Sequence, residues 1–379
     1  MTNTSDVIIL GAGMAGASLA AELSTRCKVT LLELEDQPGR HATGRSAAMF
    51  FASYGNATIR GLTRASRSFL ETPPEGFVDV PLMIHRPCLI VAGQQGLQQL
   101  DQLGSAPDTR HMRRLDADET LQQLPILNRE WVAGSMLEED CFDLEVAALH
   151  QSYLRVARRK GVAIVLGARE TRLERKPGCW SVSSRAGVHE APLLINAAGA
   201  WADEVARAAG VAPVGLVPKR RTAFMIPAPK GHDITHWPAV VDASEQFYFK
   251  PDAGQLLVSP ANEDPMAPCD AAPDEMDIAL AVDRFERATT LQVTKVTTPW
   301  AGLRSFVADK SPVLGFDAGA DGFFWLAGQG GYGIQTAPAM ARTAAALVLG
   351  EDIPADIRAQ GVSREAFSPD RPGLARAAR

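Results

Sequence analysis

The first 35 residues contain the pattern that most constrains the fold of this chain. The apolar run DVIIL is followed by the glycine-rich GAGMAG, a helix-forming stretch and a second β-branched run, KVTLLEL. Strand, glycine turn, helix and strand in this order predict a βαβ unit. Gly11 permits the tight turn, Gly13 lets a pyrophosphate approach the backbone, and Gly16 lets the helix pack on the strand. Glu33 ends the second strand, where an acid binds ribose hydroxyls, so the sequence predicts a dinucleotide site.

The composition is that of a soluble globular protein and argues against several kinds of partner. A length of 379 residues suits two domains, and 46% hydrophobic with 22% charged residues is ordinary. A net charge of −6 argues against nucleic acid or an anionic membrane surface. Five cysteines without Cys-x-x-Cys spacing predict reduced thiols in a cytoplasmic protein, with no disulfide framework and no metal site. No signal peptide or membrane span is predicted.

The rest of the chain alternates between two kinds of segment. Helices are predicted at residues 146–160 and 334–349, and the strand FFWLA precedes the second of them. Residues 215–300 contain several strand candidates and one helix, 274–288, which predicts an inserted and mostly antiparallel sheet. GQGGYG, residues 328–333, also fits G-x-G-x-x-G, but no strand follows its helix. It therefore predicts a helix N-terminus that faces a bound ring, not a second nucleotide half-site.

Several stretches together carry a resemblance to a known family. They are the N-terminal glycine motif, HATGRSAA, NAAGAW, GLRSFVADKSP and GQGGYGIQT. As a set they resemble the D-amino acid oxidase and sarcosine oxidase group of FAD flavoproteins. Within that group, QPG-H-TGRSAA, PKRR-AF, FY-KPDAG and WAGLRSFVAD are most similar to the D-arginine dehydrogenases. The resemblance implies non-covalently bound FAD and oxidation of the Cα–N bond of an amino acid to an imine, which water hydrolyses.

The resemblance also implies an α/β fold in which a Rossmann-like FAD-binding domain is interleaved with a substrate domain of mostly antiparallel sheet. The expected FAD-binding segments are residues 1–76, 143–214 and 305–361, and the substrate-binding segments are 77–142 and 215–304. Residues 362–379, rich in proline and arginine, are expected to form a mobile tail. The residues expected to contact FAD are Gly11, Ala12, Gly13, Met14, Ala15, Gly16, Glu33, Leu34, Thr43, Gly44, Arg45, Ser46, Ala47, Ala48, Ala198, Gly199, Trp201, Arg304, Gly330, Gly331, Tyr332, Gly333, Ile334 and Gln335.

Three consecutive cations, Lys219, Arg220 and Arg221, interrupt the strand-like run GLVPKRRTAFMI. A buried unpaired cation is costly, so an anion is expected nearby. In a strand, Lys219 and Arg221 face one way and Arg220 the other. By resemblance, Arg221 and Arg304 hold the substrate carboxylate, which suits the bidentate fork of arginine. The alternative is pairing with acids such as Asp242 or Asp309, and this is the expectation for Lys219 and Arg220.

Two tyrosines complete the predicted catalytic set. Tyr248 alternates with two phenylalanines, so its hydroxyl points away from their rings, and by resemblance it faces the substrate. Tyr54 matches a tyrosine on a loop that closes over the ligand. No histidine or paired carboxylate is placed as a general base, so the amine proton is expected to leave to water or to a tyrosine-linked water.

The side-chain pocket departs from the D-arginine dehydrogenase pattern. Cys88 stands where an acid would receive a substrate guanidinium, and Met49 stands where a histidine would lie. An unpaired guanidinium against these residues and Phe51 is disfavoured, so apolar or aromatic side chains are predicted. The alternative is that Asp242 or Glu245 restores an anion. The residues predicted to contact the substrate are Met49, Phe51, Cys88, Val241, Gly331 and Gln335.

Several functions stay open at this point. The first is an FAD-dependent dehydrogenase or oxidase of apolar D-amino acids. The nearby alternatives are a sarcosine- or glycine-type amine oxidase and a D-amino acid dehydrogenase of basic substrates. An FAD-binding sensor or assembly subunit without turnover is the alternative of another class. The expected partners are an amino-acid substrate and an electron acceptor, and no motif identifies that acceptor as oxygen, a quinone or another molecule, or sets the oligomeric state.

Overall fold

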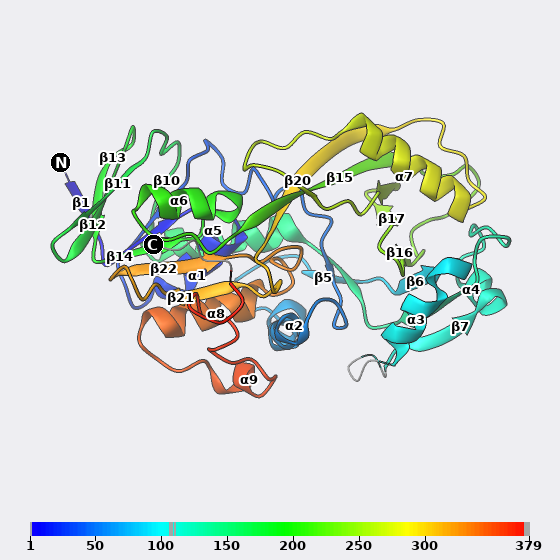
Figure 1. Ribbon diagram of the computed structural model, residues 1–379, viewed down its shortest axis with the longest axis horizontal. Helices are drawn as coiled ribbons and strands as arrows, with labels where there is room; N and C mark the ends of the chain where they lie inside the picture. The colour runs from blue at the N-terminus through cyan, green and yellow to red at the C-terminus, as the bar shows by residue number, and fades with distance from the viewer. Residues whose placement is uncertain (1, 106–108, 110, 375–379) are drawn as a thin grey trace.

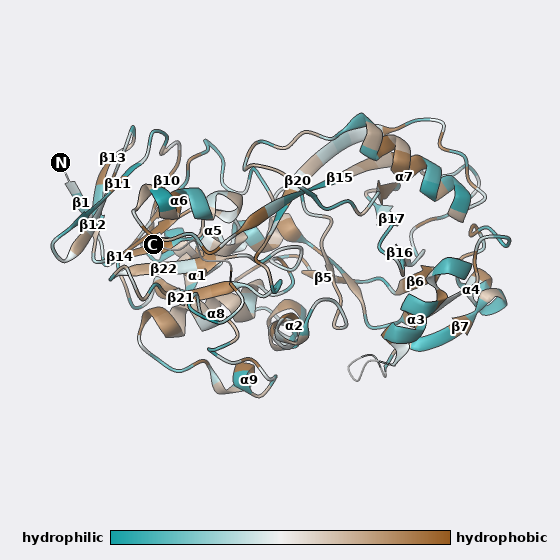
Figure 2. Ribbon diagram, in the orientation of Figure 1, coloured by the Kyte–Doolittle hydropathy of each residue, from teal (hydrophilic) through white to brown (hydrophobic). Residues whose placement is uncertain are grey.

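A computed structural model describes residues 2–105, 109 and 111–374, and its first domain is built on a six-stranded sheet. The order across this sheet is β10 (Ala163–Val165), β3 (Val29–Leu32), β2 (Val7–Leu10), β14 (Leu193–Asn196), β22 (Phe323–Ala327) and β21 (Val313–Phe316). The first five strands are parallel, and β21 is antiparallel to β22. Helices or strands cover both faces, so the parallel strands are continuous apolar runs, brown in Figure 2.

The two faces of this sheet pack on different layers. One face contacts the helices α1 (Met14–Leu23), α5 (Val146–Arg159) and α8 (Ala337–Val348), with α2 (Ala57–Glu71) and α9 (Ala355–Arg358) outside them. The other face packs with α6 (Ala202–Ala208) and a second sheet around Trp180, Phe323 and Trp325. That sheet has the order β1 (Thr2–Thr4), β13 (Gly187–Ala191), β12 (Cys179–Ser184) and β11 (Arg172–Lys176), and it lies at the left of Figure 1.

The second domain is built on a mostly antiparallel sheet, at the right of Figure 1. Its order is β19 (Asp264–Pro265), β15 (Val217–Pro227), β18 (Gln255–Ser259), β17 (Tyr248–Asp252), β16 (Ala239–Asp242), β6 (Cys88–Ala92), β8 (Gly134–Glu138) and β7 (Arg113–Asp116), and β20 (Thr297–Phe306) pairs with β15. Within this sheet, as far as the described residues show, only the β16–β6 pair is parallel. Further helices are α3 (Leu97–Gly104), α4 (Ala117–Gln123) and α7 (Glu275–Ala288).

The chain crosses between the two domains several times, as the α/β fold with interleaved domains predicts. Strands of the first sheet come from both ends of the chain, and the second sheet takes its strands from residues 88–138 and 217–306. A small sheet of β4 (Met49–Phe50), β9 (Phe142–Leu144) and β5 (Met83–His85) joins segments that were assigned to different domains. Strand β20 continues through the expected boundary after residue 304.

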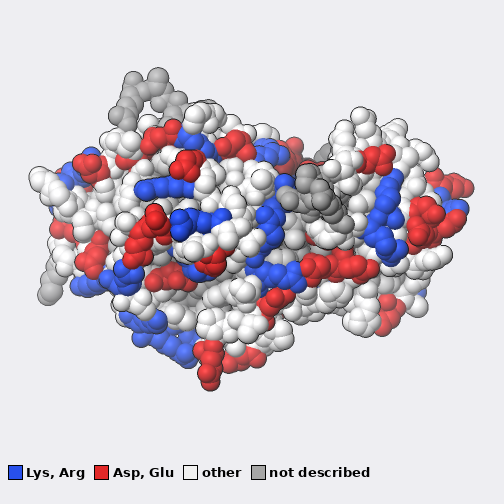
Figure 3. Space-filling model, turned by 90° about the horizontal axis from the view of Figure 1, so that it is seen from below, with Lys and Arg blue, Asp and Glu red and all other residues white. Residues whose placement is uncertain are grey.

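The charged surface and the helix lengths place few constraints on partners. Figure 3 shows lysine and arginine side chains interspersed with aspartate and glutamate over one face of the molecule. Within the described ranges, no helix is long and apolar enough to cross a membrane. No group of three or more histidine, cysteine, aspartate or glutamate side chains in those ranges could hold a metal ion.

The prediction of a mobile tail does not hold for residues 362–374. Val362 and Phe367 are buried in the core beside α8, and the Phe367 carbonyl accepts a hydrogen bond of 3.0 Å from the Leu314 amide of β21. Arg371 bonds both carboxylate oxygens of Asp309, at 2.7 and 2.9 Å. The proline and arginine content suggested mobility, but two spaced apolar side chains dock this segment on the core. Residues 375–379 lie outside the described residues.

Replacement of Phe367 by alanine should therefore destabilise the whole first domain. The ring is fully buried, and removing a buried phenylalanine ring typically costs about 3–5 kcal/mol of unfolding free energy. Thermal unfolding of Phe367→Ala, compared with an alanine variant of the exposed Arg364, measures this effect. Equal melting temperatures for the two variants would show that the segment does not contribute to the core.

Candidate active site

A cavity of about 450 Å³ lies where the two domains meet. Its walls come from the carboxyl ends of β2, β3, β14 and β22 on one side and from β15, β17 and β20 on the other. In parallel α/β sheets, ligands bind at the carboxyl edge of the strands, because the loops there leave a crevice. The cavity is therefore in the position expected for a dinucleotide that also reaches the second domain.

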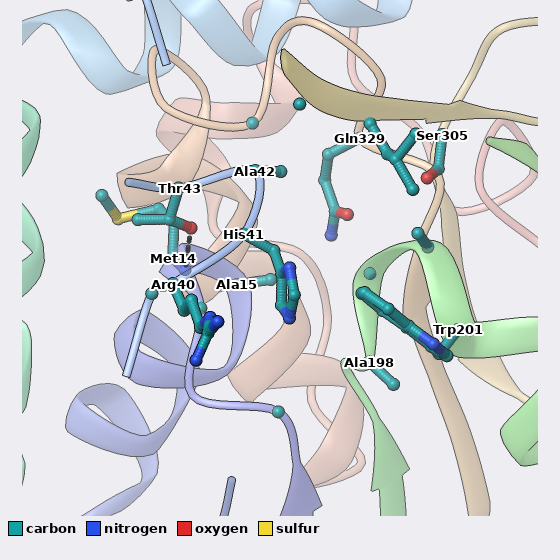
Figure 4. A pocket seen from close by; sticks show the side chains of 18 of the residues that line it. Met14, Ala15, Arg40, His41, Ala42, Thr43, Ala198, Trp201, Ser305 and Gln329 are labelled. Carbon is teal, nitrogen blue, oxygen red and sulfur yellow. Dashed lines mark hydrogen bonds between the residues drawn. The ribbon is translucent and has the colours of Figure 1, made fainter. Parts of the chain in front are cut away.

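The glycine motif shapes the nucleotide end of the cavity as the sequence predicted. Gly11 has a φ of +100°, and a Cβ there would lie 2.5 Å from the Ala197 carbonyl oxygen. A Cβ on Gly16 would lie 1.9 Å from the Gly11 oxygen, so only glycine permits this helix–strand contact. Glu33 faces the cavity and accepts a 2.7 Å hydrogen bond from the Ala12 amide. Thr43 accepts one of 2.9 Å from the Met14 amide, drawn in Figure 4.

Two buried polar atoms in this cavity have no partner among the described residues. They are Nδ1 of His41 and Nε2 of Gln329, and both side chains project toward the middle of the cavity in Figure 4. The other ring nitrogen of His41 lies 3.0 Å from Glu35, and its ring centroid lies 4.6 Å from that of Trp201. Buried polar groups are normally hydrogen-bonded, so both atoms fit a polar ligand. His41 and Gln329 were not predicted, although both lie inside the motifs HATGRSAA and GQGGYG.

The loop between β22 and α8 approaches the second domain closely. A Cβ on Gly330 would lie 2.2 Å from the Phe306 ring, and one on Gly331 would lie 2.9 Å from Nη1 of Arg304. The helix begins at Ala337, three residues later than predicted, because residues 328–336 form turns before it. Gly330, Gly331 and Gly333 thus line the cavity with backbone instead of side chains.

The three consecutive cations of β15 separate by face, as the strand alternation predicted. Lys219 and Arg221 both reach Glu263, with distances of 2.8 and 3.3 Å. Arg220 points the other way and pairs with Asp277 of α7 at 3.0 Å. Arg220 and Lys219 are therefore structural, whereas Arg221 also lines the cavity.

Arg304 joins Arg221 on the cavity side of the sheet. Lys219 pairs with Arg304 in the β15–β20 register, so Arg304 and Arg221 are diagonal neighbours on one face. Arg304 has no carboxylate within ion-pair distance in the described part of the chain, and its nearest polar side-chain partner is the Tyr54 hydroxyl, 3.5 Å from Nη1. Burial, and then repulsion by Arg304, lowers the pKa of the Arg221 guanidinium. Burial would lower the pKa of Arg304, but the charges of Tyr54, Tyr248 and Glu263 outweigh it, and this pKa lies above its ordinary value. Two adjacent guanidinium groups, one of them without an ion pair in the described chain, fit a ligand carboxylate.

Each of the two predicted tyrosines lies beside one of these cations. Burial alone would raise the pKa of the Tyr248 phenol, but the charges of Arg304 and Arg221 outweigh it, and the pKa lies below its ordinary value. The guanidinium carbon of Arg221 lies 5.9 Å from the centroid of the Tyr248 ring. Tyr54 sits on the loop between β4 and α2, and its ring packs edge-on against Tyr332 with centroids 4.8 Å apart.

The residues predicted to receive the substrate side chain form one apolar cluster. Met49, Phe51, Cys88 and Val241 lie together with Cys141, Ala239 and Ile90. The cluster does not line the 450 Å³ cavity, but Val241 is paired with Tyr248 in the β16–β17 register. Burial raises the pKa of the Cys88 thiol well above its ordinary value, so this side chain is neutral.

Of the two acids considered as an alternative anion, Asp242 points away from this cluster. Asp242 lies on the opposite face of β16 from Val241, and its carboxylate accepts the amides of Ser244 and Gln246, each at 3.1 Å. Glu245 is an exposed turn residue with a φ of +54°. An acid on the cluster face is Glu138, opposite Cys88 in the β6–β8 register, and no local sequence pattern pointed to it.

A family model described as FAD dependent oxidoreductase, DAO, matches residues 6–347. The chain belongs to this family. FAD is therefore its cofactor, and the cavity residues fit that cofactor. The resemblance to the D-amino acid oxidase group is thus confirmed, whereas the narrower likeness to the D-arginine dehydrogenases stays a prediction.

Individual relatives are similar along the whole chain but distant in sequence. The hydrogen cyanide synthase subunit HcnC of Pseudomonas aeruginosa is 27% identical over 431 residues, with 100% of both chains covered. The crystal structure of glycine oxidase from Geobacillus kaustophilus has a TM-score of 0.82 and 20% identity, covering 96% of this chain and 99% of that one. The L-alpha-glycerophosphate oxidase of Mycoplasma pneumoniae with FAD bound has a TM-score of 0.80 and 20% identity, covering 92% of this chain and 95% of that one. These structures show the fold.

Most residues predicted to contact FAD line the cavity of this DAO-family protein. They are Gly11, Gly13, Met14, Ala15, Glu33, Leu34, Thr43, Arg45, Ser46, Ala47, Ala198, Gly199, Trp201, Arg304, Gly330, Gly331, Gly333 and Ile334. Six predicted residues do not line it: Ala12, Gly16, Gly44, Ala48, Tyr332 and Gln335. The Gln335 side chain is hydrogen-bonded to other parts of the protein. Its Oε1 accepts from the Phe51 amide at 3.1 Å, and its Nε2 donates to the Thr63 hydroxyl at 2.9 Å. Its side chain joins two protein segments, where cofactor and substrate contacts had been predicted.

The purified protein should be yellow and should release one FAD per chain on treatment with acid or heat. The reason is that the cavity holds a dinucleotide through backbone amides and polar side chains, without an assigned covalent tether. Absorbance and mass measurement of the supernatant after precipitation test this. Flavin that stays with the precipitated protein would contradict non-covalent binding, and Gly11→Val should lose FAD because its Cβ would collide with the Ala197 carbonyl.

Proposed function

We propose that this DAO-family protein oxidises D-amino acids, preferably those with apolar or aromatic side chains, to imino acids that water hydrolyses to 2-oxo acids and ammonia. The observation that carries the proposal is the pair Arg221 and Arg304 on one face of the β15–β20 sheet at the FAD cavity. A substrate with an α-carboxylate supplies the anion that these two cations lack.

Each cation has a separate task in holding that carboxylate. Arg304, free of any carboxylate in the described part of the chain, offers its fork for a bidentate contact. Arg221 is oriented by the Asn262 carbonyl, 2.7 Å from its Nε, and by Glu263 at 3.3 Å. Two fixed donors on one carboxylate restrict rotation of the substrate and so orient its α-carbon. Bound FAD supplies the two-electron acceptor for the hydride that leaves this carbon.

Proton removal from the substrate amine is assigned to water held at the tyrosines. No histidine or unpaired carboxylate of the described chain lies beside Arg221 and Arg304. Tyr248 lies beside Arg221, and its lowered pKa brings the phenol nearer to the range of an amine. Its phenolate form can accept the amine proton, and its neutral hydroxyl can position a water that does so.

The choice of side chain is assigned to the apolar cluster around Cys88. Val241 of this cluster is on the sheet face that carries Tyr248, one strand beyond it, and Cys88 is on the same face two strands beyond it. A neutral buried thiol beside Met49 and Phe51 offers no partner for a guanidinium, whereas an aliphatic or aromatic side chain loses no hydrogen bond there. We propose the D form of the substrate because the stretches PKRR-AF, FY-KPDAG and WAGLRSFVAD resemble the D-arginine dehydrogenases.

A glycine- or sarcosine-type amine oxidase is the second candidate. It is favoured by the structural likeness to a glycine oxidase. Such a substrate keeps the carboxylate clamp but leaves the apolar cluster empty. An FAD-binding subunit without turnover is the remaining alternative, and anaerobic bleaching of the flavin by amino acids distinguishes it from either enzyme. The acceptor that reoxidises the flavin is to be identified by comparing oxygen consumption with reduction of an artificial acceptor.

Alanine at Arg304 or Arg221 should lower kcat/KM strongly. Each variant loses a charge-assisted contact worth about 1.5–3 kcal/mol, which corresponds to a fall of about 10- to 150-fold in kcat/KM. Each also loses part of the orientation of the substrate. Arg304→Ala should have the larger effect, because Glu263 already compensates part of the Arg221 charge. Arg304→Lys should recover only part of the loss. The matched control is Arg220→Ala, which changes a cation of the same run on the opposite face.

The unmutated enzyme should prefer D-leucine, D-methionine or D-phenylalanine over D-arginine, glycine and sarcosine. The ratio of kcat/KM for these apolar substrates to that for D-arginine should exceed about 10- to 200-fold. That range is the effect of a missing methylene group, and leaving a cation unpaired costs more. Values of kcat/KM with an artificial acceptor measure the order. Cys88→Glu should shift the substrate order toward D-arginine. The shift should be smaller than for an isolated carboxylate, because Glu138 lies opposite and two adjacent carboxylates disfavour each other's charge. D-arginine as the best substrate would refute the assignment of the cluster, and glycine as the best would support the second candidate.

A further inference from the structure

Glu138 is a fully buried acid that the proposed chemistry leaves unused. It is the last residue of β8, and it has no lysine or arginine ion pair among the described residues. Its Oε1 accepts a hydrogen bond from the Ser53 amide at 3.3 Å and lies 3.2 Å from Nε2 of His111. Its Oε2 accepts the hydroxyl of the same Ser53. The Cys141 thiol also hydrogen-bonds this carboxylate. A buried carboxylate without a lysine or arginine partner depends strongly on each of its hydrogen bonds.

Ser53 is the residue before Tyr54, on the loop between β4 and α2. The loop is hydrogen-bonded to the FAD-binding domain on both sides of Ser53. The Phe51 amide donates to Gln335 at 3.1 Å, and the Asn56 side chain donates to Ser311 at 2.9 Å. Glu138 belongs instead to the nine-stranded sheet of the other domain. The Ser53–Glu138 contact therefore ties this loop to the domain that presents Arg221 and Tyr248.

We propose that Glu138 is a positioning residue that holds the loop of residues 51–56 against the second domain, so that the Tyr54 hydroxyl stays at Arg304 in the carboxylate site. This inference rests on the proposed function, since it assumes that a substrate carboxylate binds at Arg304. The carboxylate acts through Ser53 and touches neither FAD nor the substrate.

A competing role for Glu138 is to bind a cationic substrate side chain, because it shares a sheet face with Cys88. The hydrogen bonds favour the positioning role. Both oxygens already accept from the backbone amide and hydroxyl of Ser53, and His111 approaches Oε1 from the surface, with 41% of its side chain exposed. The carboxylate is thus directed to the loop, and the cationic role becomes an outcome of the test.

Loosening this contact should reduce the fraction of enzyme in which the loop is in place. A substrate that binds only when the loop is in place then has an apparent affinity reduced in proportion to that fraction, whatever side chain the substrate carries. Glu138→Gln keeps the shape but replaces charge-assisted bonds with neutral ones, which are about half as strong. KM for D-leucine and D-phenylalanine should rise by the same factor, about 5-fold or more, while kcat changes less.

The experiment compares FAD-loaded Glu138→Gln and Ser53→Ala with Glu139→Gln, a control that changes an exposed acid next in the chain. The first measurement is KM and kcat for D-leucine, D-phenylalanine and D-arginine. The second is hydrogen exchange of the backbone amides of residues 51–56, which needs no substrate. Ser53→Ala keeps the test open if Glu138→Gln does not fold. In a Tyr54→Phe background, the Glu138 substitution should raise KM no further, because the hydroxyl contact that it maintains is already gone.

The expected result is faster exchange of this loop and an equal rise of KM for the two apolar substrates in both variants, with the control unchanged. Unchanged exchange and unchanged KM would overturn the inference. A loss confined to D-arginine would overturn it in favour of cation binding. Faster exchange in a protein whose flavin no amino acid reduces would uphold the role of Glu138 in the loop and refute the proposed function.

Discussion

Two guanidinium groups, those of Arg221 and Arg304, lie on one face of the β15–β20 pair at the edge of the FAD cavity, where the charge of Arg304 acts against that of Arg221. The register of this long antiparallel pair places the two side chains together. Glu263 offsets part of the charge on Arg221, and Arg304 is left without a carboxylate in the described chain. A ligand with a carboxylate relieves the repulsion, which connects the fold of the second sheet directly to the class of substrate that we propose.

The interleaved chain path allows one site to use both domains. The first domain contributes the glycine turn at Gly11 and the backbone of residues 328–334, where side chains would fill the cavity. The second contributes the cations and Tyr248. Tyr54 comes from a loop of the first domain, yet its neighbour Ser53 is bound by Glu138 of the second. The relative placement of the domains and the position of Tyr54 are therefore not independent.

Much of the nucleotide half was predictable because its rules are local. The turn at Gly11, the close packing at Gly16 and the position of Glu33 each depend on neighbours in one βαβ unit. Strand alternation likewise separated Arg220 from Arg221 correctly. The errors came where remote contacts decide the outcome. Phe367 docks on a core built mainly from distant segments, and Gln335 hydrogen-bonds Thr63 instead of facing the cavity.

The sequence by itself determined the dinucleotide site and the alternation of side chains along each strand, because glycine geometry and backbone periodicity operate over a few residues. The resemblance of several separate motifs indicated the family and FAD. Only the tertiary structure decided which charges meet. Asp242 turned out to lie on the far face of its strand, and the acid opposite Cys88 is Glu138, whose partner Ser53 is 85 residues away in the chain. Strand order and register set such pairings, and these depend on the packing of the whole sheet.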